Sequence, residues 1–172
     1  MTDEETDDRA SPFWRFSLGF YRQPGVADAC ITLQDGCGVD VNVLLFFLWL
    51  ATTQQCVSSE VARAVCERSD AWRNDVVAPL RAIRRRLKEG SALVERGATA
   101  VFRTKIKALE LESERLQQEA LFALAGGLAT ENATTVETAA QINVASYEDV
   151  LGRTLNPASI SALLGTLAVC RT

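Results

Sequence analysis

Four polar side chains that could bind a metal ion or transfer protons precede a long apolar run in the sequence. They are Gln34, Asp35, Asp40 and Asn42. Two carboxylates at this spacing are able to bind Mg²⁺ or to act as a general acid and base. The sequence has no second acidic motif that would complete a two-sided metal site. A helix cap within a buried polar cluster is the simpler explanation, so we predict no metal ion and no other cofactor.

The complete absence of histidine narrows the chemistry further. A Ser-His-Asp triad, a Cys-His pair and a His-ligated metal are all excluded within the chain. The five cysteines are an odd number and form no C-x-x-C motif, so we expect reduced thiols that are mostly buried. We therefore lean against an enzyme, and a carboxylate-dependent enzyme that uses Asp35 and Asp40 ranks third among the functions considered.

A second candidate site is a basic helix face with i, i+3, i+4, i+7 spacing, formed by Arg81, Arg84, Arg85 and Lys88. The segment 63–107 around it holds 12 basic and 5 acidic residues, although the whole chain has a net charge of −4. Such a face can bind the phosphates of a nucleic acid or an acidic protein partner. It can equally be a solvated face that pairs with acidic residues of the following helix, namely Glu110, Glu112, Glu114 and Glu119.

The third candidate site is aromatic, because eight of the twelve aromatic residues lie within the first 49 positions. Between helices they could line a pocket for an apolar ligand, although aromatic residues more often fill a core. The residues considered for a pocket are Trp14, Tyr21, Phe47, Trp49 and Trp72. A sizeable cavity beside Trp14, Phe47 or Trp49 would support a pocket, whereas tight packing would indicate a core.

The element that must position these residues is the run 43–51, in which nine consecutive residues are apolar. A helix that is apolar on every side is buried on every side. The run is too short to cross a bilayer, which requires about 20 apolar residues. Asp40 precedes the run as a candidate N-cap. We predict an all-α protein, a compact single-domain bundle of 7–8 helices around a buried central helix at about residues 40–52.

Hydrophobic periodicity, proline and glycine mark the other helices. The expected ranges are 12–23, 26–35, 71–88, 101–125 and 136–151, with one further helix starting at Ser58 or Ser59 and a last one at Pro157. Pro79 should kink or divide its helix near Val77. Residues 126–135 are expected to form a loop.

The longest helix carries residues at 4-3-4-3 spacing, which predict a heptad seam. They are Phe102, Ile106, Leu109, Ser113, Leu116, Ala120 and Ala123. The seam would pack against the preceding helix in an antiparallel hairpin, or against a second copy of the chain in a homodimer. The sequence leaves monomer and homodimer undecided.

Residues 1–10 are expected to be a disordered acidic arm, and residues 11–172 a single all-helical domain. The arm contains five acidic residues, which is the opposite of the basic start of a signal peptide. No segment resembles a transmembrane helix, so we predict a cytoplasmic protein without a membrane span. The arm could also fold onto the basic helix face and mask it.

The first half of the chain contains several distinctive motifs. They are Phe13-Trp14-x-Phe16-Ser17-Leu18, Pro24-Gly25-Val26, Leu33-Gln34-Asp35, Gly38-x-Asp40-Val41-Asn42 and Leu44-Leu45-Phe46-x-Leu48-Trp49-Leu50-Ala51, followed by Trp72 and Pro79-Leu80-Arg81-x-x-Arg84-Arg85-x-Leu87-Lys88. Over residues 12–90 the chain resembles a small family of proteobacterial proteins that is known only as a domain of unknown function. The resemblance implies an all-helical cytosolic protein and carries no established activity.

The function favoured by these observations is a non-catalytic interaction or adaptor module that contacts an acidic protein partner through the Arg-rich helix face. The alternative is a helical protein that binds a small apolar ligand in an aromatic-lined pocket, and nucleic acid is a less favoured partner. An adaptor predicts that Arg81, Arg84 and Arg85 are exposed together and not paired internally.

Overall fold

The computed structural model describes residues 10–169, so the expected acidic arm lies outside the described residues except for residue 10. The helices are α2 (Pro12–Tyr21), α3 (Val26–Cys37), α4 (Val41–Thr52), α5 (Ser59–Trp72), a π-helical segment η1 (Arg73–Val77), α6 (Ala78–Arg86), α7 (Arg96–Ala125), α8 (Val136–Leu151) and α9 (Pro157–Val169). The all-α prediction is confirmed. Counting α5, η1 and α6 as one continuous helix gives seven helices among the described residues, within the predicted number.

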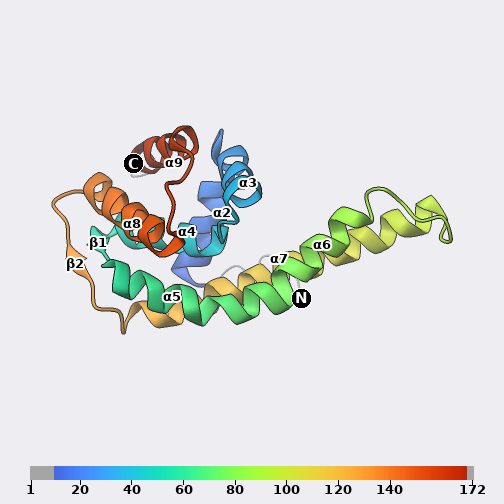
Figure 1. The fold of residues 1–172 in the computed structure, drawn as a ribbon, viewed down its shortest axis with the longest axis horizontal. Coiled ribbons are helices and arrows are strands. Elements are labelled where there is room, and N and C mark those ends of the chain that lie inside the picture. The colour runs from blue at the N-terminus through green and yellow to red at the C-terminus, as the bar shows by residue number, and fades with distance from the viewer. Residues whose placement is uncertain (1–9, 170–172) are drawn as a thin grey trace.

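Helix α4 is the central helix, as its sequence predicts (Figure 1). Asp40 is its N-cap, and the Asp40 carboxylate accepts the backbone N–H groups of Asn42 and Val43. Most residues of α4 are fully buried, and the side chains of Phe46 and Phe47 have no exposed surface. An all-round apolar surface and a satisfied N-terminus together explain why this short segment forms a buried helix.

Aromatic contacts join α4 to the helices that cover it. Phe13 of α2 packs edge-on against Phe46, with ring centroids 5.4 Å apart. Tyr147 of α8 contacts Phe47 in the same way at 5.5 Å. Trp49 is only partly buried, and it packs between the rings of Phe46 and Phe122. Three of the predicted elements thus meet on one hydrophobic core.

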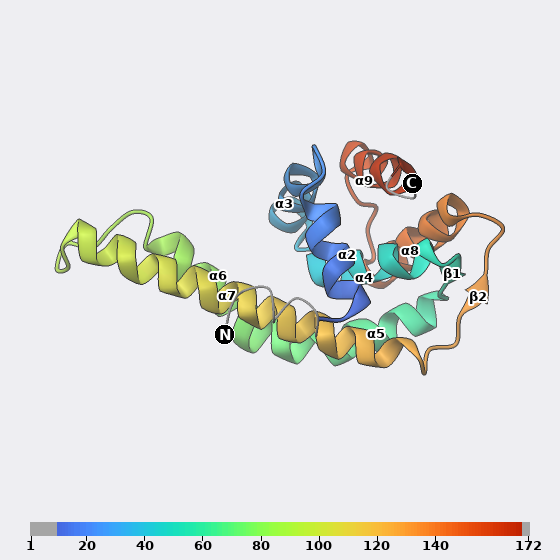
Figure 2. The ribbon, with the colours of Figure 1, turned by 180° about the vertical axis from the view of Figure 1, so that it is seen from behind.

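Helices α5, η1 and α6 run antiparallel to α7 and form a long hairpin (Figures 1 and 2). The outer part of this hairpin projects away from the other helices, which all lie on one side of it. Helix α7 begins at Arg96, earlier than the predicted residue 101, and the hydroxyl of the buried Thr99 donates to the carbonyl of Glu95 in its first turn. The antiparallel arrangement of the two longest helical segments is as expected.

The predicted heptad seam of α7 is only partly the face that closes the hairpin. Ile106 and Ser113 are buried, but Phe102, Leu109 and Leu116 are 52%, 55% and 43% exposed. The buried face of α7 consists mainly of polar residues. They are Thr99, Glu110, Ser113, Gln117 and Gln118, and the apolar Ile106 and Leu121 complete the face. The seam prediction is therefore corrected, because hydrophobic spacing cannot detect a contact that is held by ion pairs and amides.

Pro79 leaves the chain helical and does not divide it. Proline lacks a backbone N–H, and its ring clashes with the carbonyl four residues earlier. In η1 the spacing widens, so that the N–H of Ala78 donates to the carbonyl of Arg73, five residues back. This single π-helical turn absorbs the clash immediately before Pro79.

The connector after α4 and the loop after α7 pair as two short antiparallel strands, β1 (Gln55–Cys56) and β2 (Glu131–Asn132). The sequence predicted a connector and a loop without strands here. Ser58 is the N-cap of α5, one of the two predicted candidates, and its hydroxyl accepts the N–H of Val61.

None of the helices between residues 10 and 169 is both long and apolar enough to cross a membrane. In the same part of the chain four cysteines are present and unpaired, two of them buried, and Cys170 lies outside it.

Candidate ligand-binding cleft

A cleft of about 630 Å³ lies between the hairpin and the helices α2, α3 and α4. One wall comes from α2, α3 and α4, and it combines aromatic and aliphatic side chains with a few polar ones. The other wall is charged and comes from α6 and α7. The residues of the three candidate sites that line it are Trp14, Tyr21, Gln34, Asp35, Asn42, Arg81, Arg84, Arg85 and Lys88. The fold thus brings members of all three groups, which are far apart in the sequence, to a single site.

The aromatic wall is built on α2. Ser11 caps this helix by accepting the N–H of Trp14, and Pro12 occupies its first turn. Trp14 is buried against the core, whereas Tyr21 is 38% exposed at the end of the helix. Burial of the phenol nevertheless raises the pKa of Tyr21 to about 12, so it stays protonated at neutral pH. This wall offers a ligand an indole, a phenol and aliphatic side chains.

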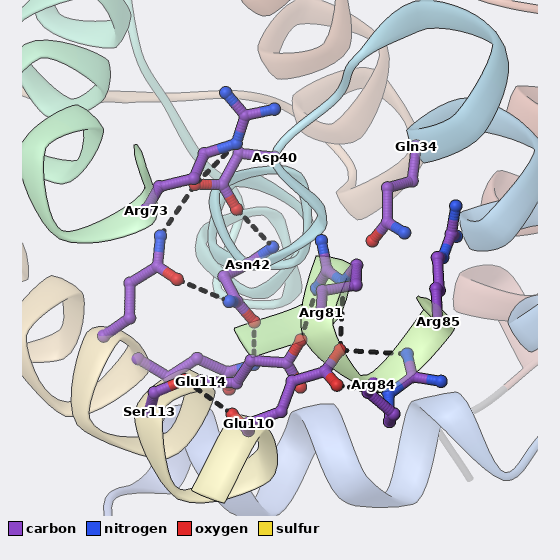
Figure 3. A network of polar contacts seen from close by, with 12 residues as sticks. Gln34, Asp40, Asn42, Arg73, Arg81, Arg84, Arg85, Glu110, Ser113 and Glu114 are labelled. Carbon is purple, nitrogen blue, oxygen red and sulfur yellow. Dashed lines mark hydrogen bonds and ion pairs between the residues drawn. The ribbon is translucent and has the colours of Figure 1, made fainter. Parts of the chain in front are cut away.

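The opposite wall carries the predicted basic residues, and three of them are paired with acidic groups. Figure 3 shows the pairs that Arg81 and Arg84 form with acidic residues of α7. Arg81 donates to Glu110 over 3.0 Å and also pairs with Glu114, while Arg84 donates to both oxygens of Glu110. Arg85 pairs across the cleft edge with Asp35 at 2.6 Å, where both side chains are nearly half exposed. The expectation that Arg81, Arg84 and Arg85 are exposed together and not paired internally is therefore wrong, because each has an acidic partner within the protein. The pairing with α7 matches the alternative of a face paired with that helix in part, because two of the four acids expected there take part.

The carboxylates on this wall have shifted pKa values in opposite directions. Burial tends to raise the pKa of Glu110, but hydrogen bonds from Arg84 and Arg81 and their charge outweigh it, so the pKa is lowered. For Glu114 burial dominates, and its pKa is raised although Arg81 opposes the shift. The Arg85 contact lowers the pKa of Asp35. Glu110 is therefore the fixed anion that holds α6 on α7.

We expect Glu110→Gln to destabilise the protein at neutral pH by about 1–3 kcal/mol, because Arg81 and Arg84 lose a charged acceptor. Because the pKa of Glu110 is lower in the folded protein than its ordinary value of 4.5, its ionised carboxylate stabilises the fold at pH values above about 4.5. This stabilisation is lost as the pH falls through the folded-state pKa. The variant should therefore show a shallower loss of stability on acidification. Urea unfolding at several pH values between about 3 and 7, a range that spans the titration of glutamate, measures both effects.

The matched control for Glu110 is Glu112→Gln. Glu112 pairs with Arg115 on the surface of α7, where the side chains are 52% and 36% exposed. Such a pair contributes less than about 1 kcal/mol. Equal effects of the two substitutions would contradict a structural role for Glu110.

A relay of buried side chains begins at Asp40 and runs to the cleft floor (Figure 3). The Asp40 carboxylate accepts the amide N–H of Gln117 at 2.7 Å, and the Gln117 carbonyl accepts from Asn42 at 2.6 Å. The Asn42 carbonyl in turn accepts from Gln118 at 2.7 Å. A carboxylate can only accept, so it sets the orientation of each amide in the series. The relay ends at the carbonyl oxygen of Gln118, which has no hydrogen-bond partner among residues 10–169.

Asp40 is held as the start of the relay by several donors. Burial raises the pKa of its carboxyl, and the opposing influences are the Gln117 hydrogen bond, the charge of Arg73 and the two capping N–H groups. Arg73 lies 3.8 Å away and also donates to the carbonyl of Gly38 at 2.6 Å. Ser69 makes a further contact at 3.4 Å.

Two polar atoms of the cleft lining are buried without a hydrogen-bond partner in the described structure: the Ser17 hydroxyl and the Gln118 carbonyl. Both residues are about 4% exposed or less. An unpaired buried polar group costs roughly 1–3 kcal/mol, so a partner at either atom stabilises the protein. Both atoms are covered by neighbouring groups, so a ligand in the cleft reaches them only where the lining side chains shift.

The remaining predicted site residues lie elsewhere. Phe47 and Trp49 belong to the core around α4 and do not line the cleft. Trp72 lines a different groove between α5 and α7. Asp40 lies behind the cleft in the relay, and no hydrogen bond or ion pair joins it to Asp35 in the described structure. The pair of carboxylates considered for acid–base chemistry is therefore not brought together.

Several residues of the cleft were not singled out from the sequence. They are Ser17, Lys107 and Gln118, together with Glu110 in its role as the anchor of α6. Gln117, in the relay behind the cleft, was not singled out either. The available signal is the spacing of Lys107, Glu110, Glu114 and Gln118, which places polar residues along one side of α7. Within residues 10–169 no three His, Cys, Asp or Glu side chains come together as a potential metal site.

The fold and the cleft define an all-α protein with an open, ligand-sized cleft between a helical bundle and a long hairpin. The model of a family described as "Protein of unknown function (DUF2390)" matches residues 12–121, which is more than half of the chain. The protein therefore belongs to this family, in agreement with the resemblance seen in its motifs. No curated protein and no solved structure matches the chain.

Proposed function

We propose that the protein is a non-catalytic interaction module whose cleft binds an acidic segment of a protein partner that also carries apolar side chains. The observation that supports this most strongly is the meeting of the aromatic wall of α2 and the basic row of α6 across one cleft. Each wall suits one property of such a segment. Trp14 and Tyr21 suit its apolar side chains, and cations opposite them suit its carboxylates.

The cations available to a partner are those without a fixed internal acid. Lys88 and Lys107 both line the cleft, are exposed, and form no ion pair within the described part of the chain. Arg85 is paired with Asp35, but this contact is nearly half exposed and contributes little. A carboxylate of the partner can replace Asp35 at small cost. Arg81 and Arg84 instead serve to hold the wall in place through Glu110.

The cleft lining also contains the Gln118 carbonyl and the Ser17 hydroxyl, which have no hydrogen-bond partner in the described structure. Both atoms are covered by neighbouring groups, so a bound segment would pair with them only where the lining side chains shift. The proposal therefore depends on the two walls of the cleft and not on these atoms.

A small amphipathic anion is the second candidate, favoured by the volume of the cleft. Small-molecule sites typically measure about 300–1,000 Å³, and the cleft measures about 630 Å³. Its contacts would be of the same kind, with an apolar body against Trp14 and an anionic group near Lys88 and Lys107. The two candidates differ in the size of the ligand that binds, which is a compact molecule in one case and a peptide segment in the other.

The test uses a fluorescein-labelled peptide in which glutamates alternate with leucines, and a matched peptide with glutamine in place of glutamate. We expect the first peptide to bind the wild-type protein and the second to bind at least tenfold more weakly, or roughly 1.4 kcal/mol. The double substitution Lys88→Glu/Lys107→Glu should raise the dissociation constant of the first peptide by a similar factor. Fluorescence anisotropy gives the dissociation constants, and displacement of the peptide by an aromatic sulfonate would favour the small ligand.

The control variant is Arg63→Glu/Arg153→Glu, which makes the same change of net charge at two exposed arginines outside the cleft. It should leave the dissociation constant within about twofold, because separated surface charges are screened. The proposal fails if both double variants weaken binding equally, or if the glutamine peptide binds as well as the glutamate peptide.

The finer expectations about source and location stay predictions. A proteobacterial origin, a cytoplasmic location and the organisation of residues 11–172 as one domain are compatible with the family match and with the helical fold. The acidic arm remains a candidate competitor for the cleft, since its carboxylates have the charge that the proposed partner supplies.

A further inference from the structure

The outer face of α7 carries a row of exposed apolar side chains. Phe102, Leu109 and Leu116 are spaced by seven residues and are 52%, 55% and 43% exposed. Residues seven apart lie on nearly the same side of an α-helix, at about 100° per residue. The row is therefore a continuous apolar stripe about 21 Å long, at roughly 1.5 Å per residue.

This stripe and the cleft lie on opposite sides of the hairpin. Leu111 lines the cleft and follows Leu109 by two residues, which corresponds to a rotation of about 200° around the helix axis. Figures 1 and 2 show all other helices on one side of the hairpin. The stripe faces away from them and is open to a partner.

Trp72 extends the same face from the neighbouring helix. Its indole N–H donates to the carbonyl of Ser113 at 3.0 Å, and its ring is 39% exposed. It lines a groove of about 320 Å³ together with Leu116, Ala120 and Leu124. A fixed tryptophan beside a heptad row is the kind of anchor on which helical interfaces are built.

The charge of the hairpin changes sign along its length. The outer part, residues 81–107, has nine basic and two acidic residues. The inner parts, residues 60–77 and 108–125, together have eight acidic and four basic residues. Leu109 lies close to the boundary between the two.

We propose that two copies of this chain associate antiparallel through this stripe, with the outer part of each hairpin against the inner part of the other. A two-fold axis near Leu109 makes the interface self-complementary, and it places Phe102 of one copy near Leu116 of the second. The arrangement buries both stripes and sets the positive end of each hairpin against the negative end of its neighbour. A parallel arrangement would set like charges together.

The charge pattern disfavours other occupants of the stripe. A nucleic acid or an anionic lipid surface would meet the acidic inner part as well as the basic outer part. A second copy is the occupant whose charges match over the whole length. The cleft stays open in the dimer, so the inference stands independently of the proposed function.

The test is sedimentation velocity over a range of protein concentrations. Wild-type protein should form dimers, and Leu109→Lys should raise the dissociation constant at least tenfold while circular dichroism shows an unchanged helical content. The control Ile142→Lys introduces the same charge at an exposed apolar position of α8, away from the hairpin, and should leave dimerisation unchanged. Higher salt should weaken the dimer.

The direction of association is tested by oxidative cross-linking of cysteine variants. A mixture of Phe102→Cys and Leu116→Cys should form a bond between the two variants, whereas Phe102→Cys alone should form little. Monomers at every concentration, dimers of Leu109→Lys as tight as those of the wild type, or efficient cross-linking of Phe102→Cys with itself would each overturn the proposal.

Discussion

Phe46→Ala should lower the free energy of unfolding by about 3–5 kcal/mol, the cost typical of removing a fully buried phenylalanine. The Phe46 side chain has no exposed surface and contacts the rings of Phe13, Phe47 and Trp49. Its removal leaves a cavity in the middle of α4, where fixed helices on several sides prevent collapse. Chemical unfolding followed by circular dichroism measures the loss.

The matched control for Phe46 is Phe102→Ala, which deletes the same atoms from a side chain that is 52% exposed. In dilute protein this change should cost less than about 1 kcal/mol, because the exposed ring buries little apolar area. Trp49→Ala should lower the free energy of unfolding by less than Phe46→Ala does, since Trp49 is only partly buried. A small effect of Phe46→Ala would contradict the role of α4 as the centre of the core.

Asn143→Ala should cost about 2–5 kcal/mol, since roughly 1–3 kcal/mol is lost for each buried polar group left without a partner. Asn143 of α8 is fully buried. Its carbonyl accepts the N–H of Val57 at 2.8 Å, and its amide donates to the carbonyls of Phe47 and Gln55. The substitution removes the Asn143 partner of the Val57 N–H and of the Gln55 carbonyl in the connector after α4, and urea unfolding measures the cost.

Asn143→Asp distinguishes hydrogen bonding from packing. The aspartate has the same shape, but its ionised carboxylate cannot donate to the two carbonyls. Burial raises the pKa of such a group, so its penalty is greatest at neutral pH and decreases as the pH falls through the folded-state pKa. The exposed Asn132→Ala, in β2, should change stability by less than about 0.5 kcal/mol. A pH-independent penalty for Asn143→Asp would contradict this account.

The helices themselves were largely predictable, because their signals are local. The apolar run predicted α4, and Asp40 predicted its start. The range 136–151 and the start at Pro157 agree with α8 and α9. Each of these predictions depends on a capping residue, a proline or a hydrophobic periodicity within the segment itself.

The polar contacts that hold the helices together were not predictable in the same way. Asn143, Gln117 and Gln118 have the composition of solvent-facing helix residues, yet all three are buried. Their partners on α4 and at its N-cap lie about 75 or more residues away in the sequence. Only the packing of α4 against α7 and α8 makes these contacts, so a single sequence gives no local signal for them.

The predicted seam of α7 is a second case in which the sequence pattern did not identify the buried face. The 4-3-4-3 spacing from Phe102 to Ala123 predicted the buried face, and it correctly includes Ser113. The face that closes the hairpin also contains Glu110 and Gln117, which lie outside that spacing. Burial of the ion pair between Glu110 and the α6 arginines requires that face to turn inward. The leucines are then left on the outside.

The π-helical turn η1 has a consequence for length variation within the family. A π turn accommodates one extra residue without unwinding the helix around it. It therefore keeps α6 in the phase that an uninterrupted α-helix one residue shorter would give. Deletion of a single residue of η1, such as Asn74, should restore regular α-helical spacing and leave Arg81 and Arg84 facing Glu110. A deletion within α5 would instead turn both arginines by about 100° around the helix axis. Relatives that lack one residue at η1 should therefore carry the basic row in the same orientation.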